Sequence, residues 1–335
     1  NLDDSAVVKE LRNLGMHELL EGLAAEDARS DDAGKLAAAV DATLALAAGL
    51  TDPEARKKVL DTAVRLIDKL LPLAQAHAAQ PDAPVLTRIE PLRLRLRRAV
   101  ARGVTQAEPY ANQILYLLAD DADRWKVLAC RREALASLPA LANDIATEEA
   151  LQQNGVRPVG RSRRLAALTA EARYNQAWML LYAGIATPTD AEGLKARAQI
   201  LGDAILLASE WLPPAPDEIR RGGGVSLKIR QDAILIAGIA SRELKQNDKA
   251  REYLEQLLDD PAPPTLRARA LFELARMVVE EGRLAPGLAA IKGFRDKAAG
   301  KGLKTADVEA QATLLTSHLY DILAAAASPT TAPAK

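Results

Sequence analysis

The chain has 335 residues, of which 49% are hydrophobic but only 3% are aromatic. Alanine and leucine alone contribute 67 and 52 residues, so the apolar surface is aliphatic and mostly small. This composition favours close-packed helices over sheets, and the apolar fraction is too high for intrinsic disorder. A net charge of −1 lacks the positive excess that is usual in dedicated nucleic-acid binders.

Three features concern localisation and thiol chemistry. No segment reaches the ~18 consecutive apolar residues that a membrane span needs, and the best candidate, 36–50, is interrupted by Asp41 and predicts a buried helix. The single cysteine, Cys130, cannot form an intrachain disulfide and is expected to be a small buried residue on a helix. Because the chain begins with Asn1 rather than Met, we expect export to the periplasm or cell surface, with the cytoplasm as the alternative.

Helical periodicity dominates the chain. In the first half it predicts helices over 5–14, 17–25, 36–49, 53–79, 86–102, 105–119 and 123–153, the last one divided at Pro139. In the second half it predicts helices over 165–183, 191–212, 227–244, 247–258, 265–280, 284–299 and 305–327. No segment makes a convincing strand. Thr51 with Glu54, and Thr189 with Glu192, are predicted capping boxes.

Breaks in this pattern give the expected domain organisation. Pro213–Pro216 and the following glycines form the clearest connection, and the end of the chain has low complexity. We expect an N-terminal helical repeat region over 1–155, middle hairpins over 156–212, a connection over 213–226, C-terminal repeats over 227–327 and a disordered tail over 328–335.

An internal repeat with a period of 37 residues lies near the C-terminus. The first copy contains Ile234, Ala237, Gly238, Lys245 at a turn, Ala250, Leu254 and Leu257. The second contains Leu271, Leu274, Ala275, Gly282 at the turn, Gly287, Ile291 and Phe294. This pattern predicts a helix–turn–helix unit. A small residue in the first helix admits the second helix, and a small residue early in the second helix, Ala250 or Gly287, contacts the first in return.

This unit resembles the tetratricopeptide repeat family. Gly238, Ala250 twelve residues later and Pro261 match the family pattern, although Ile234 and Ser241 replace its aromatic residues. The resemblance implies an all-α fold of helix hairpins stacked as a right-handed α-solenoid. It also implies a non-enzymatic scaffold or structural subunit that binds a protein partner, or other copies of itself, along the solenoid surface.

Patterns typical of catalysis or metal binding are weak. The three histidines, His17, His77 and His318, have no metal-ligand spacing, and no GxSxG segment occurs. Acidic groups at helix junctions favour capping over acid–base chemistry. We therefore expect no catalytic residue, no metal and no cofactor. An all-α enzyme whose site is invisible in sequence is the second alternative.

Arginine clusters are the candidate partner-binding residues. Six arginines and one acid lie between 88 and 102, where the spacing predicts an arginine face on a helix, and guanidinium groups bind carboxylates and phosphates bidentately. The predicted binding residues are Arg95, Arg98, Arg102, Arg161, Arg163 and Arg164. The segment 1–35 carries nine acids against four bases, so the acidic end of another copy is one candidate partner. A solvated face is the plain alternative.

A glycine-rich turn between basic residues is a candidate anion-binding loop. It consists of Arg220, Arg221, Gly222, Gly223 and Gly224. Glycine backbone before a helix can bind an anion, although no Walker lysine follows, and a flexible turn is the alternative. Anion or nucleic-acid binding is thus the first alternative function. Nucleic acid is the less expected ligand because aromatic residues are not interleaved with the arginines, and isolated Trp125 is expected in the core.

Overall fold

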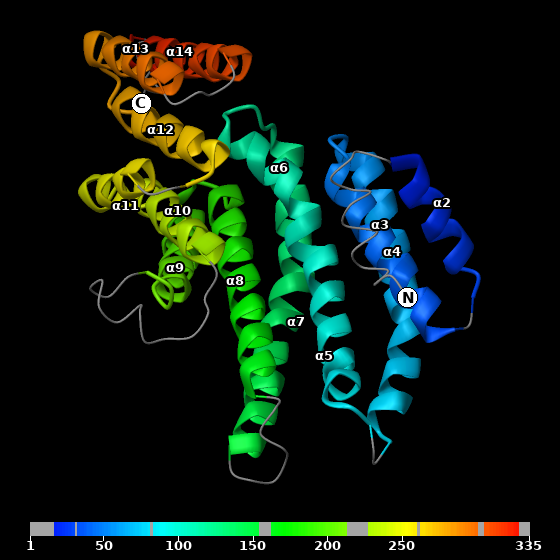
Figure 1. Ribbon diagram of the computed structural model, residues 1–335. Coiled ribbons are helices and arrows are strands. Elements are labelled where there is room, and N and C mark those ends of the chain that lie inside the picture. Colours follow the sequence, from blue (N-terminus) through cyan, green and yellow to red (C-terminus); the bar gives the residue numbers. More distant parts are fainter. Residues whose placement is uncertain are drawn as a thin grey trace, which may run out of the picture. The chain divides into compact units, whose positions relative to one another are not determined.

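The computed structural model describes residues 17–30, 32–80, 83–153, 162–212, 227–259, 262–300 and 305–327. Within these ranges the chain is all-α and contains no strand (Figure 1). It divides into two compact units. The first comprises 1–112 and 121–186, and the second comprises 113–120 and 187–335.

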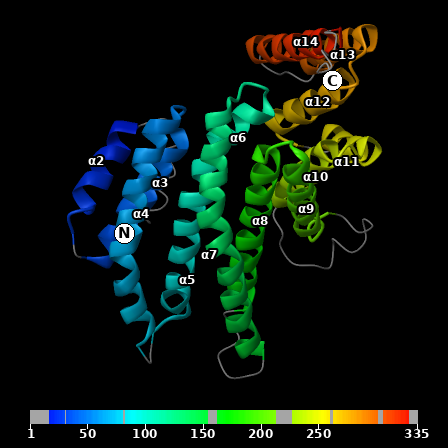
Figure 2. The same cartoon turned by 180° about the vertical axis from the view of Figure 1, so that it is seen from behind.

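In the first unit, each helix packs mainly on its neighbours in the sequence (Figure 2). The helices are α2 (His17–Asp27), α3 (Ala33–Gly49), α4 (Pro53–Ala78), α5 (Val85–Val100), the π-helical turn η1 (Ala101–Thr105), α6 (Gln106–Leu115), α7 (Asp121–Gln153) and α8 (Ser162–Ala186). Alanine-rich α3 is buried as predicted, with Leu36 and Val40 packed against Ile67 and Leu70 of α4 and Leu94 of α5.

Proline positions in the first unit differ from the expected helix breaks. Pro139 lies inside a continuous α7, so its predicted division of this helix is wrong. A proline removes one backbone hydrogen bond, and extensive packing along one face keeps the helix intact. The two helices predicted over 86–102 and 105–119 are also continuous, joined by η1. At this turn a Cβ on Gly103 would collide with Ala134 of α7, so the glycine permits a close helix contact.

The predicted capping residues are one position away from the observed ones. Asp52 accepts a hydrogen bond from the Ala55 N–H at 2.9 Å, and Asp190 accepts one from the Gly193 N–H at 2.7 Å. Thr51 and Thr189 are therefore not the caps. An aspartate and a threonine stand side by side at both sites, and the carboxylate is the better acceptor for the exposed N–H groups of the first turn.

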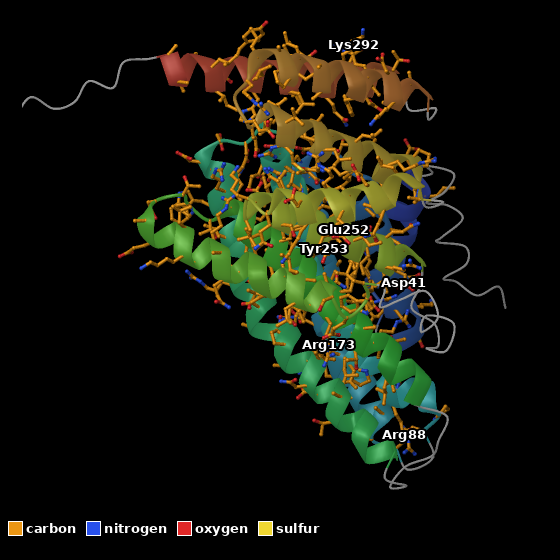
Figure 3. The ribbon with its side chains drawn as sticks, turned by 90° about the vertical axis from the view of Figure 1, so that its left-hand side faces the viewer. Asp41, Arg88, Arg173, Glu252, Tyr253 and Lys292 are labelled. Carbon is orange, nitrogen blue, oxygen red and sulfur yellow. The ribbon has the colours of Figure 1, made fainter. Side chains whose placement is uncertain are left out.

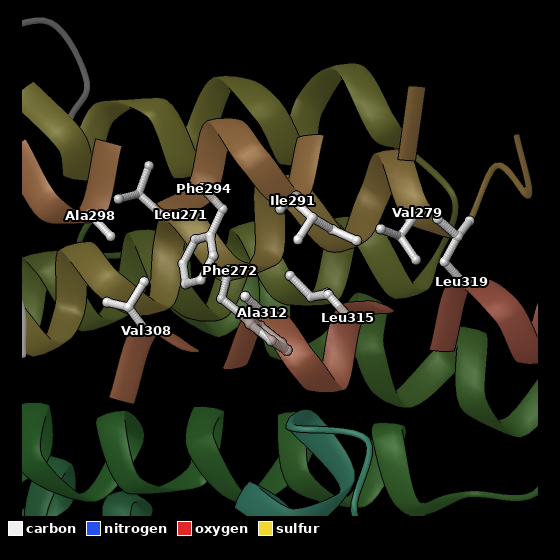
Figure 4. Close-up of a cluster of buried hydrophobic side chains, with 11 residues drawn as sticks. Leu271, Phe272, Val279, Ile291, Phe294, Ala298, Val308, Ala312, Leu315 and Leu319 are labelled. Carbon is white, nitrogen blue, oxygen red and sulfur yellow. The ribbon is translucent and has the colours of Figure 1, made fainter. Parts of the chain in front are cut away.

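The second unit contains six described helices in addition to 113–120. They are α9 (Ala191–Ala208), α10 (Leu227–Glu243), α11 (Asn247–Asp259), α12 (Pro264–Val279), α13 (Leu284–Gly300) and, at the C-terminal end, α14 (Thr305–Ala327). Its main core joins α12, α13 and α14 through Phe272, Phe294 and Leu315, together with other aliphatic side chains (Figure 4). The rings of Phe272 and Phe294 meet edge to face at 6.3 Å.

The six helices from α9 to α14 also pack in sequence order, and the repeat of 37 residues is visible in their turns. Lys245, between α10 and α11, and Gly282, between α12 and α13, both have left-handed backbone conformations, with φ of 60° and 68°. In the first copy, the Lys245 N–H donates to the Arg242 carbonyl at 2.9 Å, which closes the end of α10. Equivalent positions in the two copies therefore adopt the same turn conformation.

Two glycines of the repeat show close helix contacts, one of them within its own unit. A Cβ on Gly238 would lie 2.8 Å from Leu254 of α11, so this glycine does admit the second helix of its unit. Gly287 instead lies against Leu319 of α14, 2.7 Å from its Cδ2 if a Cβ were added. Its predicted contact with the first helix of its own unit stays a prediction. Gly287 therefore leaves room for Leu319 of the following helix, α14.

Several sequence predictions lie outside the described residues. They are the helix over 5–14, the connection over 213–226 and the tail over 328–335. The middle region expected over 156–212 is divided between the units, since α8 belongs to the first unit and α9 to the second.

Candidate functional site

The arginine face predicted on 86–102 forms on α5 and the first turn of η1, and acids of the same unit pair with it. Arg95 pairs with Asp144 at 2.8 Å, Arg98 with Asp68 at 2.6 Å and Arg102 with Glu133 at 3.5 Å. The acids come from α4 and α7, which flank α5. These three arginines therefore link neighbouring helices, and their binding of a partner stays a prediction.

The other predicted binding residues are not brought together with these three by any described contact. Arg163 and Arg164 lie in the first turn of α8, but their side chains are outside the described part of the structure. Arg161 and the whole candidate anion loop, Arg220 to Gly224, also lie outside the described residues.

Trp125 differs from its prediction, because its side chain is 67% exposed on α7. The buried residues of this helix recur every three or four positions, and they include Val127, Cys130 and Ala134. Trp125 lies two positions before Val127 and so falls on the opposite face. Cys130 is buried as predicted, and burial raises the pKa of its thiol to about 11, which keeps it uncharged at neutral pH.

The second unit contains a cluster of buried charges that the sequence analysis missed. Arg269, Glu273 and Arg276 of α12, and Glu280 directly after it, are spaced by three or four residues and therefore share one stripe. Together with the end of α10, this stripe forms what we call the buried charge cluster. Its members are Arg242, Glu243, Arg269, Glu273, Arg276 and Glu280.

Arg242 lies at the centre of the cluster and is only 1% exposed. Its guanidinium group lies 2.8 Å from Glu273, 3.0 Å from Glu280 and 2.6 Å from Glu243. Glu273, which is fully buried, also pairs with Arg269 at 2.6 Å. Arg276 bonds Glu280 at 2.8 Å and donates a second hydrogen bond to the Leu115 carbonyl at 3.0 Å. The cluster thus joins α10, α12 and the segment that begins at 113.

The electrostatics of the cluster favour carboxylates that are ionised at neutral pH. Burial alone would raise the pKa of Glu280, but Arg242 and Arg276 outweigh it and lower the pKa to about 2. The pKa of Glu273 is likewise below its ordinary value, because Arg242 and Arg269 outweigh the effect of burial. A general acid or base works best with a pKa near the working pH. These carboxylates are therefore suited to holding helices together rather than to proton transfer.

Among the described interactions, His318 of α14 is the only histidine whose pKa is affected by the charges of this cluster. Burial lowers the pKa of its imidazole, and the nearby Arg276 lowers it further. The ring is thus neutral at pH 7. Across the described ranges, no group of three or more His, Cys, Asp or Glu side chains is placed to hold a metal ion. No described helix has the length and apolar character needed to cross a membrane.

An apolar groove of about 570 Å³ lies elsewhere in the second unit, between 113–120, the start of α12 and α14. We call it the α12–α14 groove. Its lining includes Tyr116, Leu118, Ala268, Val308, Gln311 and Leu314. Leu118 is 60% exposed at its rim. The Oε1 atom of Gln311 is buried and has no hydrogen-bond partner among the described residues.

The local structure explains why this groove is preformed. Leu117 adopts a left-handed conformation with φ of 64°, and the Leu118 N–H donates back to the Gln113 carbonyl at 2.8 Å. This turn fixes Tyr116 and Leu118 on the groove. The Tyr116 ring packs against the ring of Phe272, with 5.2 Å between the two centroids. The Arg269 guanidinium lies over the Tyr116 ring, 4.1 Å from the centroid of that ring.

The comparisons with known proteins supply no relative. The chain matches no protein family, no curated protein and no solved structure. Its function must therefore be argued from the geometry of its own residues.

The sequence contains a signal for the buried charge cluster in the spacing of its charged residues. Arg269, Glu273, Arg276 and Glu280 are spaced by four, three and four residues, which is one face of a helix. Most of the remaining residues of α12 are apolar, so much of this helix is expected to be buried. Charges in such a helix have to find partners within the protein.

Proposed function

We propose that the protein is a non-enzymatic scaffold in which helix hairpins bind a protein partner. In the second unit we propose that the hairpins form a tetratricopeptide-like, right-handed α-solenoid. The equal turn conformations at Lys245 and Gly282, 37 residues apart, support this proposal, as does the contact between Gly238 and Leu254. Stacked hairpins leave an extended surface, which is how such arrays bind their partners.

The observation that carries the proposal is the α12–α14 groove. It is open and lined mostly by apolar side chains, and its lining includes Gln311, whose buried amide oxygen has no hydrogen-bond partner among the described residues. A bound segment that inserts an apolar side chain and donates one N–H group would satisfy both features. The ionised groups of the second unit that have shifted pKa values lie in the buried charge cluster, and none of its members lines this groove. This separation favours recognition over acid–base catalysis.

Site-specific photo-crosslinking tests the proposal. A photoreactive amino acid is introduced at Leu118 in the full chain, which is expressed in its native host and irradiated. We expect an adduct of defined mass with one protein partner. The matched control carries the same photoreactive residue at Leu206 of α9, which is 69% exposed but does not line the groove.

The proposal is contradicted if Leu118 yields no protein adduct, or if Leu206 yields the same adduct with equal efficiency. An adduct with a small molecule, together with a catalytic activity of the purified chain, would favour the enzyme alternative.

A further inference from the structure

One wall of the α12–α14 groove is a turn in a strained backbone conformation. This wall belongs to the segment 113–120, from which Tyr116 and Leu118 line the groove. Between them, Leu117 has a φ of 64°, in the left-handed region that leucine rarely adopts. Glycine is the usual residue at such a helix end, because it has no Cβ to resist this conformation. Another residue keeps the conformation only where surrounding contacts hold the chain.

Two arginines of the buried charge cluster hold this segment directly before the strained residue. Arg276 donates from Nη1 to the Leu115 carbonyl at 3.0 Å, and this hydrogen bond is buried. Arg269 places its guanidinium group 4.1 Å from the centroid of the Tyr116 ring. The two contacted residues immediately precede Leu117 in the sequence. The arginines therefore fix the chain at the point where it enters the left-handed turn.

Both arginines are directed into the protein. Arg276 and Arg269 are 8% and 6% exposed, whereas Lys292 extends outward from α13 (Figure 3). Each arginine pairs with one glutamate of the cluster, Arg276 with Glu280 at 2.8 Å and Arg269 with Glu273 at 2.6 Å. A guanidinium group has five N–H donors, of which one carboxylate accepts at most two in the bidentate arrangement. The rest of each planar group contacts the segment 113–120.

Other contacts of this segment restrain its backbone less directly. The Leu118 N–H donates to the Gln113 carbonyl at 2.8 Å, but this hydrogen bond lies within the turn itself. Phe272 packs against the Tyr116 ring, which places a side chain rather than the backbone. The hydrogen bond from Arg276, by contrast, links the backbone of the segment to another helix, and its charged donor makes it a strong one.

We propose that Arg269 and Arg276 are positioning residues of the α12–α14 groove. They hold 113–120 in its strained turn, so that Tyr116 and Leu118 form the wall before a partner binds. This proposal rests on the proposed function, because it concerns the same groove. It adds that the affinity for the partner depends on buried charges that do not line the groove themselves. Because such coupling is reciprocal, a bound partner should stabilise the turn in return.

Lysine substitutions separate this role from general stability. Arg276→Lys and Arg269→Lys keep the positive charge, but a single ammonium group lacks the planar fork that reaches a glutamate and 113–120 together. The matched control is Arg197→Lys in α9. Arg197 likewise pairs with a glutamate of the cluster, Glu243, and donates to a backbone carbonyl, that of Thr187 at 3.3 Å. Neither of these two contacts involves 113–120.

Hydrogen exchange of the full chain, measured by mass spectrometry, reports on the turn without a partner. Peptides covering 113–120 should exchange at least about tenfold faster in Arg276→Lys, because a charge-assisted hydrogen bond is lost. They should exchange about threefold faster in Arg269→Lys, where a cation–π contact is lost. Helix α12 in both variants, and 113–120 in the control, should keep the rates of the wild type. Unchanged exchange in 113–120, or an equal increase along α12, would overturn the proposal.

A second substitution tests the role of strain. Leu117→Gly combined with Arg276→Lys should return the exchange of 113–120 toward the wild-type rate, because glycine adopts the left-handed conformation without being held there. A general loss of packing around Arg276 would not be repaired by this change. Exchange that stays fast in the combined variant would therefore contradict the idea that the arginines hold a strained turn.

Photo-crosslinking at Leu118 connects the turn to binding. The yield of the protein adduct should fall at least about fivefold in both lysine variants and stay at the wild-type level in Arg197→Lys. Full yield in both lysine variants would overturn the positioning role and leave the proposed function intact. Absence of an adduct in the wild type would contradict the proposed function, whereas the exchange rates still decide whether the arginines hold the turn.

Discussion

The ion pairs of Arg95, Arg98 and Arg102 lie at the surface of the first unit, whereas those of the buried charge cluster lie in the interior of the second unit. Arg95 and Arg98 of α5, and Arg102 of η1, pair with acids of neighbouring helices while remaining partly exposed to solvent. Arg242 and Glu273 form the same kind of pair with almost no exposure. Water screens the first set, so each pair stabilises the fold little. Removal of one partner in the second set leaves a charge buried without compensation. Arginine and carboxylate pairs thus contribute little to stability at the surface of the first unit. In the interior of the second unit the same kind of pair holds α10 and α12 together.

The largest effect is expected when this buried pair is broken. Glu273→Gln should lower the free energy of unfolding of the second unit by about 3–5 kcal/mol, because Arg242 and Arg269 lose their shared carboxylate. The matched change in the first unit, Glu133→Gln opposite Arg102, should cost less than about 1 kcal/mol. Urea unfolding with Trp211 as the reporter of the second unit, in a background lacking Trp125 and Trp178, measures the first value. An equal loss in the free energy of unfolding for Glu273→Gln and Glu133→Gln would contradict the distinction between buried and surface ion pairs.

Acid should destabilise the second unit through Glu280. Its folded pKa of about 2 is below the ordinary value of 4.5, so its stabilising contribution is fully present above about pH 4.5 and is lost as the pH falls toward 2. The shift corresponds to about 3 kcal/mol. Unfolding measured between pH 5 and pH 2 should show this loss, and Glu280→Gln should flatten the pH dependence. The idea fails if the variant retains the slope of the wild type.

A smaller effect is expected from crowding at the π-helical turn of the first unit. Gly103→Ala should lower the free energy of unfolding by about 1–3 kcal/mol, since the added methyl group collides with Ala134. This loss should occur although alanine favours a helix more than glycine does. Thermal unfolding of Gly103→Ala alone and combined with Ala134→Gly tests the contact. Absence of rescue by the second substitution would show that Ala134 is not the cause.

The smallest effect concerns the start of α4. Asp52→Ala should cost about 1 kcal/mol, because the carboxylate that accepts from the Ala55 N–H is lost. Thr51→Ala, one residue earlier, should be nearly neutral. Urea unfolding followed by circular dichroism compares the two variants directly. A larger cost at Thr51 would restore the capping box that the sequence predicts.

The sequence was sufficient for the features that depend on local periodicity. The apolar spacing predicts most of the helices, and the repeat correctly pairs the turns at Lys245 and Gly282. It was less reliable where two residues compete or where packing decides. Asp52 rather than Thr51 caps α4, and packing keeps α7 continuous through Pro139. The facing of Gly287 toward Leu319 depends on a helix beyond its own repeat, which no local pattern specifies.

The candidate site was harder to predict than the fold. Arginine density directed attention to α5, but the acids that neutralise Arg95 and Arg98 are distant in sequence and become neighbours only in the folded unit. The α12–α14 groove combines Tyr116 and Leu118 with side chains about 150 and 190 residues later, so no motif could indicate it. Charge spacing along α12, by contrast, was a usable signal for the buried charge cluster.

The central claim is that the protein acts through the α12–α14 groove rather than through its ionisable groups. The most direct test combines photo-crosslinking at Leu118 with Ala268→Phe, which fills the groove from its α12 wall. The control, Ala196→Phe, places the same ring at an exposed position of α9. The account predicts that the adduct is lost in Ala268→Phe and retained in the control, with both variants folded. An adduct that persists at full yield in Ala268→Phe would contradict it.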